Sequence, residues 1–396
     1  MIKDKIQLKN WRKVRLDEIG LFRGGVTSIK PDDYGFGTPF ITYMNVFKNS
    51  KININNLELM NVPKKDVERL GCVYGDIFFT ASSETYKEIG MSSVLLNDIK
   101  NLTFNGFCKR FRLNNFNTLL PIYARYLFRS PALRYSLISK GTGDIRFNIS
   151  QQSLGEIEIL VPDTNTQKRI AKILSAFDEK VELNNKINQN LEQTAEAIFK
   201  EWFVKFKLPG RRKVKMIDSD LGKIPEGWNI RNVSDILERL PQGKTYTPEQ
   251  IQQKGFVAVY SQSSGMILGY HNESPAFSAT IDKPVILFGD HTCRMNVVTI
   301  PCSLGPNIVP FIGNIFPTIF VYFITKGKIS QREYKRHWAE FEQQKIVVPT
   351  PDLAEEYVKI VKPIISKMAI IENENQKLAS LRDLLLPRLM SGEIRV

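Results

Sequence analysis

The sequence has no long apolar run, no paired cysteines and few histidines. No stretch reaches the length of about 18 consecutive apolar residues that a membrane-spanning helix needs, and residues 1–11 lack the apolar core of a signal peptide. The four cysteines are scattered without a Cys-x-x-Cys pair, which predicts reduced thiols rather than a disulfide framework or a zinc site. The three histidines lack metal-ligand spacing. We therefore expect a cytoplasmic chain with no metal site and no contact with a membrane.

Positive charge is concentrated in the first half of the chain. The 396 residues carry a net charge of +14, and a chain of this length is expected to form about two to three domains. Residues 1–160 contain 23 basic and 15 acidic side chains, whereas residues 216–345 contain 13 and 12. An excess of lysine and arginine favours a polyanion such as nucleic acid as the partner. A basic surface that binds no partner is the alternative that composition alone leaves open.

The chain contains a duplicated module. Trp11 is followed by an aliphatic residue at +5, an acid at +7 and an isoleucine at +8, and Trp228 is followed by the same pattern at an offset of 217. The run Ile-Leu-Val-Pro at 159–162 matches Ile-Val-Val-Pro at 346–349, at an offset of 187. An ungapped alignment of about forty residues follows this second match. The predicted order is a globular block, a long helix, a second globular block and a second long helix.

Each of the two repeated long segments has the heptad spacing of a coiled coil. Residues 167–206 would form a rod of about 60 Å at about 1.5 Å per residue. Pro363 lies inside the second segment and should kink or delay that helix. Because an amphipathic helix needs a partner for its apolar stripe, we expect the two segments to pair with each other. The residues expected at this helix–helix contact are Leu174, Phe177, Val181, Asn184, Asn188, Leu191, Ile364, Ile371, Asn375 and Leu378.

Asparagines at matching positions predict a register for this helix pair. Antiparallel pairing places Asn184 opposite Asn375 and Asn188 opposite Ile371, and both pairs of numbers sum to 559, as a pseudo-twofold axis requires. A buried asparagine costs stability but fixes register and orientation. A second interpretation leaves these asparagines at a solvated edge of the helices.

The globular blocks have the pattern of short β-strands separated by glycine, proline and asparagine. The clearest β-rich runs are residues 40–44, 76–80, 109–113 and 285–289, and helical pieces are expected near 119–130 and 317–327. The predicted fold class is α+β: two strand-rich globular domains separated by two long helices that form an antiparallel coiled coil, as a pseudo-twofold internal repeat. A basic, turn-rich linker is expected between the two halves.

Motifs for enzymatic chemistry are incomplete. Residues 243–245, Gly-Lys-Thr, resemble the end of a phosphate-binding loop, but Glu238 stands where the first glycine of that loop would be. No Asn-Pro-Pro-aromatic or Asp-Pro-Pro-aromatic tetrapeptide of an adenine N6-methyltransferase occurs. Asp163 together with Asp178-Glu179-Lys180 resembles a nuclease signature, but Asp178 and Lys180 lie within a predicted long helix, not on strands that converge on a metal. We therefore predict no catalytic residue and no cofactor.

The repeated junctions resemble those of type I restriction–modification specificity subunits. Residues 221–229 are similar to the opening of the second target recognition domain in that family, and residues 159–188 are similar to its first spacer helix. Residues 381–396 resemble its usual C-terminal ending. The resemblance covers the whole chain in order and length. It implies target recognition domains at 1–160 and 228–345, long spacer helices at 161–207 and 346–396, and a basic linker at 208–227.

The resemblance implies a sequence-specific DNA-binding subunit that performs no catalysis. In this family each target recognition domain reads one half of a bipartite site in double-stranded DNA. The two helices hold the domains apart and dock two methyltransferase subunits, and restriction subunits add translocation and cleavage. S-adenosylmethionine, ATP and Mg²⁺ then belong to those partners, and no cofactor belongs to this chain. Two features depart from the pattern: Pro363 within the second helix, and the nearly neutral second block.

Loop and turn positions near strand ends are the candidate DNA contacts. Arginine and lysine suit guanine edges, asparagine and glutamine suit adenine edges, and hydroxyl groups suit phosphates. The candidates are Thr27, Ser28, Lys30, Tyr43, Asn45, Ser82, Ser83, Lys87 and Arg146 in the first block, and Gln242, Lys244, Tyr246, Ser261, Gln262, Ser263, His291, Arg294, Arg332 and Arg336 in the second. For each of them, an ordinary solvated surface residue is the alternative.

Three aromatic residues at the end of the first long helix, Phe199, Trp202 and Phe203, are candidate contacts with a partner subunit. Burial against the parent domain is the alternative for all three.

Two other functions remain as alternatives at this point. A non-catalytic coiled-coil adaptor, or scaffold, would bind nucleic acid in a salt-sensitive manner without sequence preference. A self-contained nuclease or methyltransferase would be active as the purified chain with Mg²⁺ or S-adenosylmethionine, which the incomplete motifs argue against.

Overall fold

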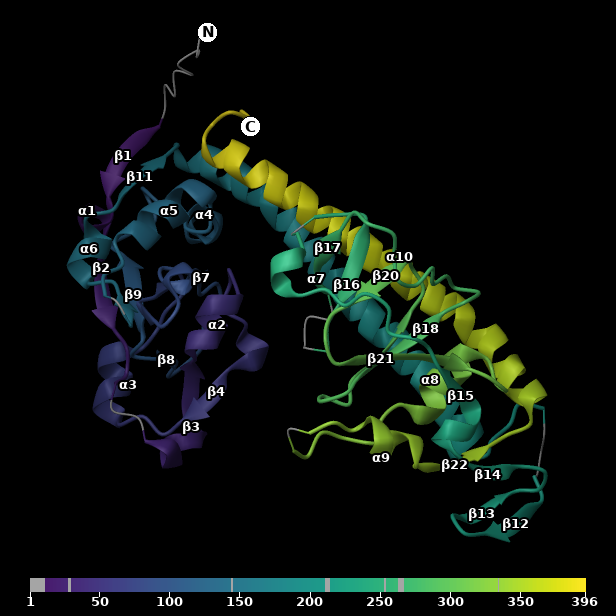
Figure 1. Cartoon of the computed structure of the whole chain (residues 1–396). Helices are drawn as coiled ribbons and strands as arrows, with labels where there is room; N and C mark the ends of the chain where they lie inside the picture. The colour runs from purple at the N-terminus through teal and green to yellow at the C-terminus, as the bar shows by residue number, and fades with distance from the viewer. Residues whose placement is uncertain are drawn as a thin grey trace, which may run out of the picture. The chain divides into compact units, whose positions relative to one another are not determined.

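The computed structural model describes residues 11–27, 30–143, 145–210, 214–252, 254–262, 267–333 and 335–396 (Figure 1). The chain forms two compact units. The first unit comprises Met1–Val181 and Gln376–Val396, and the second comprises Glu182–Asn375. The boundary between the units falls within both long helices, so each helix contributes residues to both units.

The strands of the first unit are β1 Arg12–Arg15, β2 Gly20–Gly24, β3 Tyr34–Ile41, β4 Glu58–Met60, β5 Ile77–Thr80, β6 Ser82–Ser83, β7 Ser92–Val94, β8 Thr103–Phe104, β9 Cys108–Leu113, β10 Phe147–Asn148 and β11 Glu158–Val161. They form a four-stranded sheet in the order β2–β9–β5–β7 and a three-stranded sheet in the order β4–β3–β8. β3 and β8 are parallel, and the other neighbours in these two sheets are antiparallel. Two short antiparallel pairs, β1–β11 and β10–β6, complete the set.

The described residues of the first unit form six short α-helices, and two of them begin at a side-chain cap. They are α1 Leu16–Ile19, α2 Tyr43–Lys48, α3 Lys64–Leu70, α4 Pro121–Leu127, α5 Pro131–Ser139 and α6 Gln151–Gly155. The Thr42 side chain accepts a hydrogen bond from the Asn45 N–H at the start of α2, and Ser150 does the same for Ser153 at the start of α6. α4 and α5 begin at proline, which suits the first helical turn because the N–H it lacks would be unpaired there.

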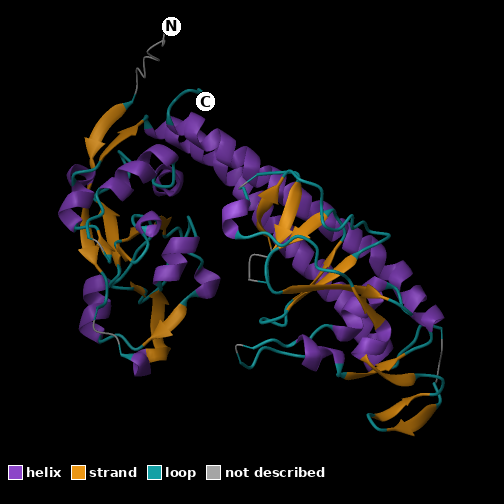
Figure 2. Ribbon diagram, viewed as in Figure 1, coloured by secondary structure: helices purple, strands orange, loops and turns teal. Residues whose placement is uncertain are grey.

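The second unit has the same architecture. Its strands are β12 Met216–Ser219, β13 Gly222–Pro225, β14 Asn229–Asn232, β15 Leu237–Arg239, β16 Val257–Tyr260, β17 Ile267–His271, β18 Val285–Gly289, β19 Met295–Val298, β20 Cys302–Leu304, β21 Ile308–Gly313 and β22 Lys345–Val348, and its short helices are α8 Thr318–Thr325 and α9 Trp338–Glu342. The order β15–β21–β18–β19 repeats the four-stranded sheet, and the order β17–β16–β20, with β16 and β20 parallel, repeats the three-stranded sheet. Figure 2 shows that each unit combines strands with short helices. The predicted α+β class and internal repeat are confirmed.

The two sequence offsets mark the strand pair that opens and closes each block. The starts of β1 and β14 differ by the offset of 217, and the starts of β11 and β22 differ by the offset of 187. In the first unit Arg12 pairs with Val161, and in the second unit Asn229 pairs with Val348, so the register is the same. The opening and closing motifs of each block recur in the sequence because they form the paired strands β1–β11 and β14–β22. The two offsets differ because the chain between them is longer in the first block.

Both long helices are continuous over the described residues. α7 spans Thr164–Phe199 and is followed by a π-helical turn at Lys200–Val204, and α10 spans Pro351–Met390. The expected kink or delay at Pro363 is wrong as far as the start of the helix is concerned, because α10 begins well before it, at another proline. Pro363 removes one backbone hydrogen bond, but Val361 and Ile365 on either side are buried in the core of the second unit and hold the helix there.

The two long helices pack against each other antiparallel within each unit. In the second unit, Asn184 Nδ2 donates to Asn375 Oδ1 (2.8 Å), and farther along α7 the Tyr357 hydroxyl donates to the Ala195 carbonyl (3.0 Å). Rising numbers on α7 therefore meet falling numbers on α10. In the first unit, Arg382 Nη1 of α10 donates to Asp178 Oδ1 of α7 (2.7 Å).

Two expected local structures are corrected. The segment 208–227 is not only a turn-rich linker, because β12 and β13 pair within it as an antiparallel hairpin; residues 211–213 lie outside the description. The strand expected at 40–44 ends at Ile41, because Thr42 caps α2 and turns the chain into that helix. The four cysteines are free thiols, as predicted.

Candidate nucleic-acid interface

Strand direction brings several loops of the first unit to one edge of its sheets. β2 and β5 both run antiparallel to β9, so their C-terminal ends lie beside the start of β9. The end of β8 joins the same edge, because the Val26 N–H donates to the Phe104 carbonyl (2.9 Å). The loops at this edge are residues 25–27, 42–49, 81–91, 105–107, 140–143 and 145–150, and we call them the first loop edge. Loops carried by a rigid sheet are the usual place for binding residues.

One exposed cation and several aromatic rings gather in three of these loops. The Arg146 guanidinium lies 5.0 Å from the centre of the Phe107 ring, which is 48% exposed. The Tyr86 ring, 41% exposed, meets the Phe147 ring edge to face at 5.1 Å. The β10–β6 pairing, which places Phe147 opposite Ser83, holds these loops together. Cations beside exposed aromatic faces suit phosphates and unstacked or partly unstacked bases.

A partly buried arginine fixes the helix that carries Tyr43 at the same edge. Arg129 Nη2 donates to the carbonyls of Val46 (3.0 Å), Phe47 (3.0 Å) and Asn49 (2.8 Å) at the C-terminal end of α2. A cation at this end of a helix complements the helix dipole and pairs the free carbonyls. Burial, followed by the charge of nearby arginines, lowers the pKa of Arg129 to about 10. Tyr43 is therefore held on a fixed element of the first loop edge.

The second unit repeats this edge with different side chains. β15 and β18 both run antiparallel to β21, and β16 and β20 are parallel, so the same loops meet. The Asp290 carboxylate accepts hydrogen bonds from the N–H groups of His337 (3.0 Å) and Trp338 (2.9 Å), and the His291 N–H donates to Gln262 Oε1 (3.1 Å). The second loop edge comprises residues 240–247, 261–262, 290–294, 305–307, 330–333 and 335–337.

Lys244 and Tyr246 of the second loop edge belong to a compact polar cluster. Lys244 Nζ (2.6 Å) and the Tyr246 hydroxyl (2.9 Å) both donate to Glu273, and these two hydrogen bonds lower the pKa of that carboxyl. The Tyr246 ring stacks on His271, with centroids 4.2 Å apart. His271 Nδ1 accepts the Glu273 N–H (3.0 Å) while Nε2 lies 2.9 Å from Ser303 Oγ, and burial lowers the pKa of this imidazole. Glu273 thus competes with any phosphate for Lys244.

Comparison with known proteins identifies a domain in the first half of the chain. Residues 8–193 match the family model described as "Type I restriction modification DNA specificity domain". This segment is a type I restriction–modification specificity domain. The chain is 25% identical to the type I restriction enzyme MjaIX specificity subunit of Methanocaldococcus jannaschii, and the match covers 98% of this chain and 94% of that protein. It is 24% identical to the HindI specificity subunit of Haemophilus influenzae, over 71% of this chain and 79% of that protein.

A solved structure shares the fold of this chain. The crystal structure of the type I restriction–modification system S subunit from M. genitalium aligns with a TM-score of 0.53 and 16% identity, covering 98% of each chain. Within the described ranges, every helix is too short or too polar to span a bilayer.

The predicted DNA-contacting residues of the chain divide by exposure. Exposed are Thr27, Lys30, Lys87, Arg146, Gln242, Lys244, Arg294, Arg332 and Arg336; partly buried are Tyr43, Ser82, Ser261, Gln262 and His291; Ser28 and Ser263 lie outside the described residues. Apart from those two, the candidates lie on the two loop edges or, for Lys30, just beyond the first one. Arg336 reaches toward Asp290, with Nε 3.8 Å from the carboxylate.

Three predicted DNA contacts are corrected because their side chains are buried and already bonded. Asn45 is 2% exposed, and its amide donates to the Asn53 carbonyl (3.0 Å) and accepts the Asn53 N–H (3.0 Å). Ser83 donates to Glu88 (2.9 Å), and Tyr246 donates to Glu273. These residues shape the loops, and other side chains of the same loops face solvent.

Three of the predicted helix–helix residues, Asn184, Asn188 and Asn375, make hydrogen bonds between α7 and α10. Asn184 (1% exposed) also donates to Glu374 (2.9 Å), Asn375 Nδ2 donates to Asn185 (2.9 Å), and Asn188 donates to the Met368 carbonyl (3.3 Å). The polar layer is therefore wider than the two asparagines alone. Leu174 and Ile371 are buried, whereas Phe177, Val181, Leu191, Ile364 and Leu378 are partly buried.

The aromatic residues expected to contact a partner subunit belong instead to the core of the second unit. Trp202 is 8% exposed and Phe203 is 6% exposed. Phe199 packs against the Phe320 ring at 6.1 Å and the Tyr357 ring at 5.7 Å. Trp202 and Phe203, within the π-helical turn, are therefore buried against the parent domain, whereas Phe199, the last residue of α7, is partly buried and stays a prediction.

Two of the nuclease-like residues, Asp163 and Asp178, have structural roles. Asp163 caps α7, with its carboxylate accepting the N–H groups of Asn165 and Thr166 (both 3.0 Å), and these bonds lower its pKa. Asp178 is buried and ion-paired with Arg125 (2.6 Å). Among the described residues, no group of three or more His, Cys, Asp and Glu side chains could hold a metal.

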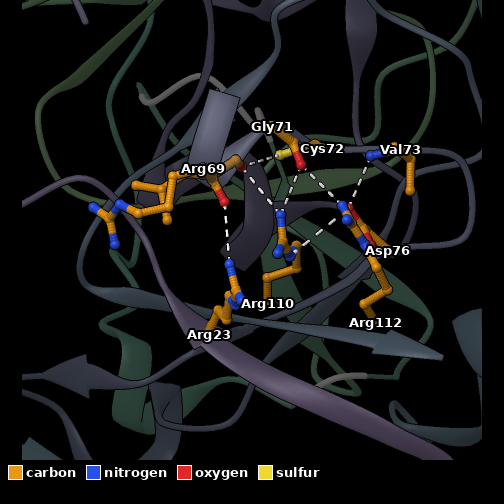
Figure 3. Close-up of polar contacts among 9 residues, drawn as sticks. Arg23, Arg69, Gly71, Cys72, Val73, Asp76, Arg110 and Arg112 are labelled. Atoms are coloured by element: carbon orange, nitrogen blue, oxygen red, sulfur yellow. Dashed lines mark hydrogen bonds and ion pairs between the residues drawn. The ribbon is translucent and has the colours of Figure 1, made fainter. Parts of the chain in front are cut away.

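An arginine cluster in the first unit was not singled out by sequence reasoning. It comprises Arg23, Arg110 and Arg112 with Asp76, and is drawn in Figure 3. The alternation of arginine in the strand run Lys-Arg-Phe-Arg-Leu at 109–113 was the available signal, because it places two cations on one face of a sheet.

Proposed function

We propose that this chain reads a two-part sequence in double-stranded DNA and directs two methyltransferase subunits to it, without catalysing a reaction itself. The observation that carries the proposal is the repetition of one fold with two loop edges whose side chains differ. Equivalent strands and helices position the loops, whereas the loops themselves carry arginine, lysine and aromatic residues in one block and arginine, glutamine and histidine in the other. Two equivalent scaffolds with different side chains suit two different half-sites.

The chemistry of the two edges supports binding to DNA. Lys87 and Arg146 on the first edge, and Arg294, Arg332 and Arg336 on the second, are exposed. Arginine binds guanine in the major groove through two parallel hydrogen bonds, and either cation binds phosphate. The strand pairs β1–β11 and β14–β22 lie next to the long helices, at the end of each block opposite its loop edge. They therefore leave the loop edges accessible.

The proposed partners account for the catalysis. Methylation would be carried out by the methyltransferase subunits, which would bring S-adenosylmethionine, and restriction subunits, where they join, would bring ATP and Mg²⁺. Exposed apolar side chains on the long helices are the proposed docking residues in place of the buried aromatic cluster: Leu183 (52%), Ile370 (60%), Leu381 (49%) and Leu384 (54%). Because the proposed substrate is chromosomal DNA, we expect the complex to work in the cytoplasm.

The proposal is tested by mapping methylated adenines in cells that express this chain with a methyltransferase of the same system. We expect one bipartite motif. The block between Leu16 and Ile157 is then exchanged for that of a relative, leaving the β1–β11 pair intact, and we expect only one half of the motif to change.

The matched control exchanges Val233–Gln344, which lies inside the β14–β22 pair, and should change the other half only. Loss of all methylation after either exchange, with the chain still folded, would point to a scaffold rather than a reader. DNA binding without any motif would refute the proposal.

A further inference from the structure

Three arginines occupy one face of the four-stranded sheet in the first unit (Figure 3). Arg23 on β2 lies directly opposite Arg110 on β9, and Arg112 follows two positions later on the same face. Like charges opposite each other in a sheet are destabilising unless neighbouring groups compensate. The compensating groups come from Asp76 and from the backbone of residues 69–71.

The inner part of this cluster is built and held firmly. Asp76 is fully buried, and its carboxylate accepts hydrogen bonds from Nε and Nη2 of Arg112 (both 2.7 Å) and from the Val73 N–H (2.8 Å). Arg110, 3% exposed, lies 3.9 Å from the same carboxylate, and its Nη1 donates to the carbonyls of residues 70 (3.1 Å) and 71 (2.7 Å). One carboxylate therefore serves two guanidinium groups, and the inner cluster keeps a net positive charge.

The rim of the cluster is exposed. Arg23 is exposed, and its Nη1 donates to the carbonyl of Arg69 at 3.3 Å, a neutral partner. A guanidinium has five N–H groups, so this contact orients Arg23 without neutralising it. The Arg69 side chain is 61% exposed and pairs with Asp66 (2.8 Å). Arg23 is the penultimate residue of β2, and the next residue, Gly24, pairs with Lys109 where the first loop edge begins.

The second unit has apolar side chains at the positions equivalent to these arginines. Leu240 is related to Arg23 by the repeat offset of 217, and its N–H donates to the Pro310 carbonyl (2.9 Å), so Pro310 takes the place of Arg110. Ile312 follows Pro310 by two residues, as Arg112 follows Arg110 by two residues. Leu240 and Ile312 pack against an apolar core cluster. The arginine cluster is thus a property of the first block, which also carries the larger excess of basic residues.

We propose that Arg23 binds a phosphate of the DNA backbone beside the first loop edge, with Arg69 as a second cation, and that the buried Arg110–Asp76–Arg112 cluster positions Arg23. The inference deepens the proposed function and rests on it. A phosphate accepts two hydrogen bonds from the planar guanidinium fork, and the positive charge left on the inner cluster adds to the attraction. The first block then anchors the chain to the backbone more strongly than the second block.

The test measures the salt dependence of DNA binding by the full-length chain. Fluorescence anisotropy with a duplex of about 40 base pairs of random sequence gives the slope of log K against log salt concentration. For Arg23→Gln we expect the slope to fall by about 0.9, so that affinity between about 50 and 200 mM salt declines about 3.5-fold less than for the wild type. Arg23→Lys should keep most of the slope, because a lysine retains the charge.

The matched control is Arg15→Gln. Arg15 is exposed and paired with Asp17 (2.5 Å), and it precedes β2, at the end of the strand away from the loop edge. Its substitution removes the same charge and should leave the slope unchanged. A folded Arg23→Gln protein, judged by an unchanged melting temperature, with a wild-type slope would refute the inference.

Selection of preferred sites from a pool of randomised duplexes, performed in parallel with the wild-type chain and its methyltransferase partners, separates the two proposals. A selected motif together with an unchanged Arg23→Gln slope overturns only the role of Arg23. A reduced slope without any selected motif overturns the proposed function and leaves Arg23 as a phosphate contact. Absence of binding by the wild-type chain overturns both.

Discussion

Asp178 joins three helices of the first unit, and its loss is the sharpest test of how that unit is held together. The side chain is 8% exposed and lies on α7. Its carboxylate accepts hydrogen bonds from Arg125 Nη2 (2.6 Å) and the Tyr126 hydroxyl (2.7 Å) on α4, and from Arg382 Nη1 (2.7 Å) on α10. At the positions that the repeat relates to Asp178 and Arg382, the second unit has the buried apolar residues Ile365 and Ala195.

Asp178→Asn removes the charge without creating a cavity. The Arg125 side chain, 8% exposed, would then be buried without its counter-charge. Removing one partner of a buried ion pair typically costs about 3–5 kcal/mol. For a unit of this size, such a loss lowers the melting temperature by about 6–20 °C.

Hydrogen exchange measured by mass spectrometry separates the two units, which need not unfold together. We expect faster exchange in α4 and in the first half of α7 for Asp178→Asn, and wild-type exchange in α8. Glu179→Gln is the matched control, because Glu179 is the next residue of α7, is exposed and loses the same charge.

Replacement of all three charged residues, Arg125, Asp178 and Arg382, by leucine should recover most of the loss, because a well-packed apolar set often equals a buried ion network. A free energy of unfolding for Asp178→Asn within about 1 kcal/mol of the wild-type value would refute this reasoning. It also fails if exchange rises equally in both units.

Three further predictions concern other sites. Asn375→Leu leaves Asn184 without its buried partner and should lower the free energy of unfolding in urea by about 1–3 kcal/mol. The double variant with Asn184→Leu should recover stability, and equal stability of the single and double variants would contradict this. Folding lowers the pKa of His271 below its ordinary value of 6.5, so the unfolded chain binds the extra proton first, and the free energy of unfolding should fall as the pH drops below 6.5. His271→Gln should flatten that fall, and an unchanged pH profile would exclude His271 as its source. Arg146→Ala should relax base preference in one half of the methylation motif only, by about 1–3 kcal/mol of discrimination if its contact is to a base; weaker binding with an unchanged motif would assign it to a phosphate.

Periodicity in the sequence was sufficient for the architecture. Heptad spacing predicts the long helices, and the matching motifs at Trp11 and Trp228 predict the repeat. Both patterns can be detected in short stretches of sequence because they reflect which face of a helix or strand is buried. The pairing of Asn184 with Asn375 was one of two interpretations that the sequence left open, and the hydrogen bond between the two side chains decides between them.

The tertiary structure decided which polar side chains are free to bind. Asn45 and Tyr246 lie in the predicted loops but point inward, where distant residues satisfy them, and no local pattern shows this. Trp202 has coiled-coil spacing yet belongs to the core of the second unit, because the π-helical turn redirects it. Arg23 became a candidate only when strand pairing placed it opposite Arg110. The sequence by itself therefore determined the elements and their repeat, whereas exposure and charge compensation, which depend on contacts between distant residues, required the folded chain.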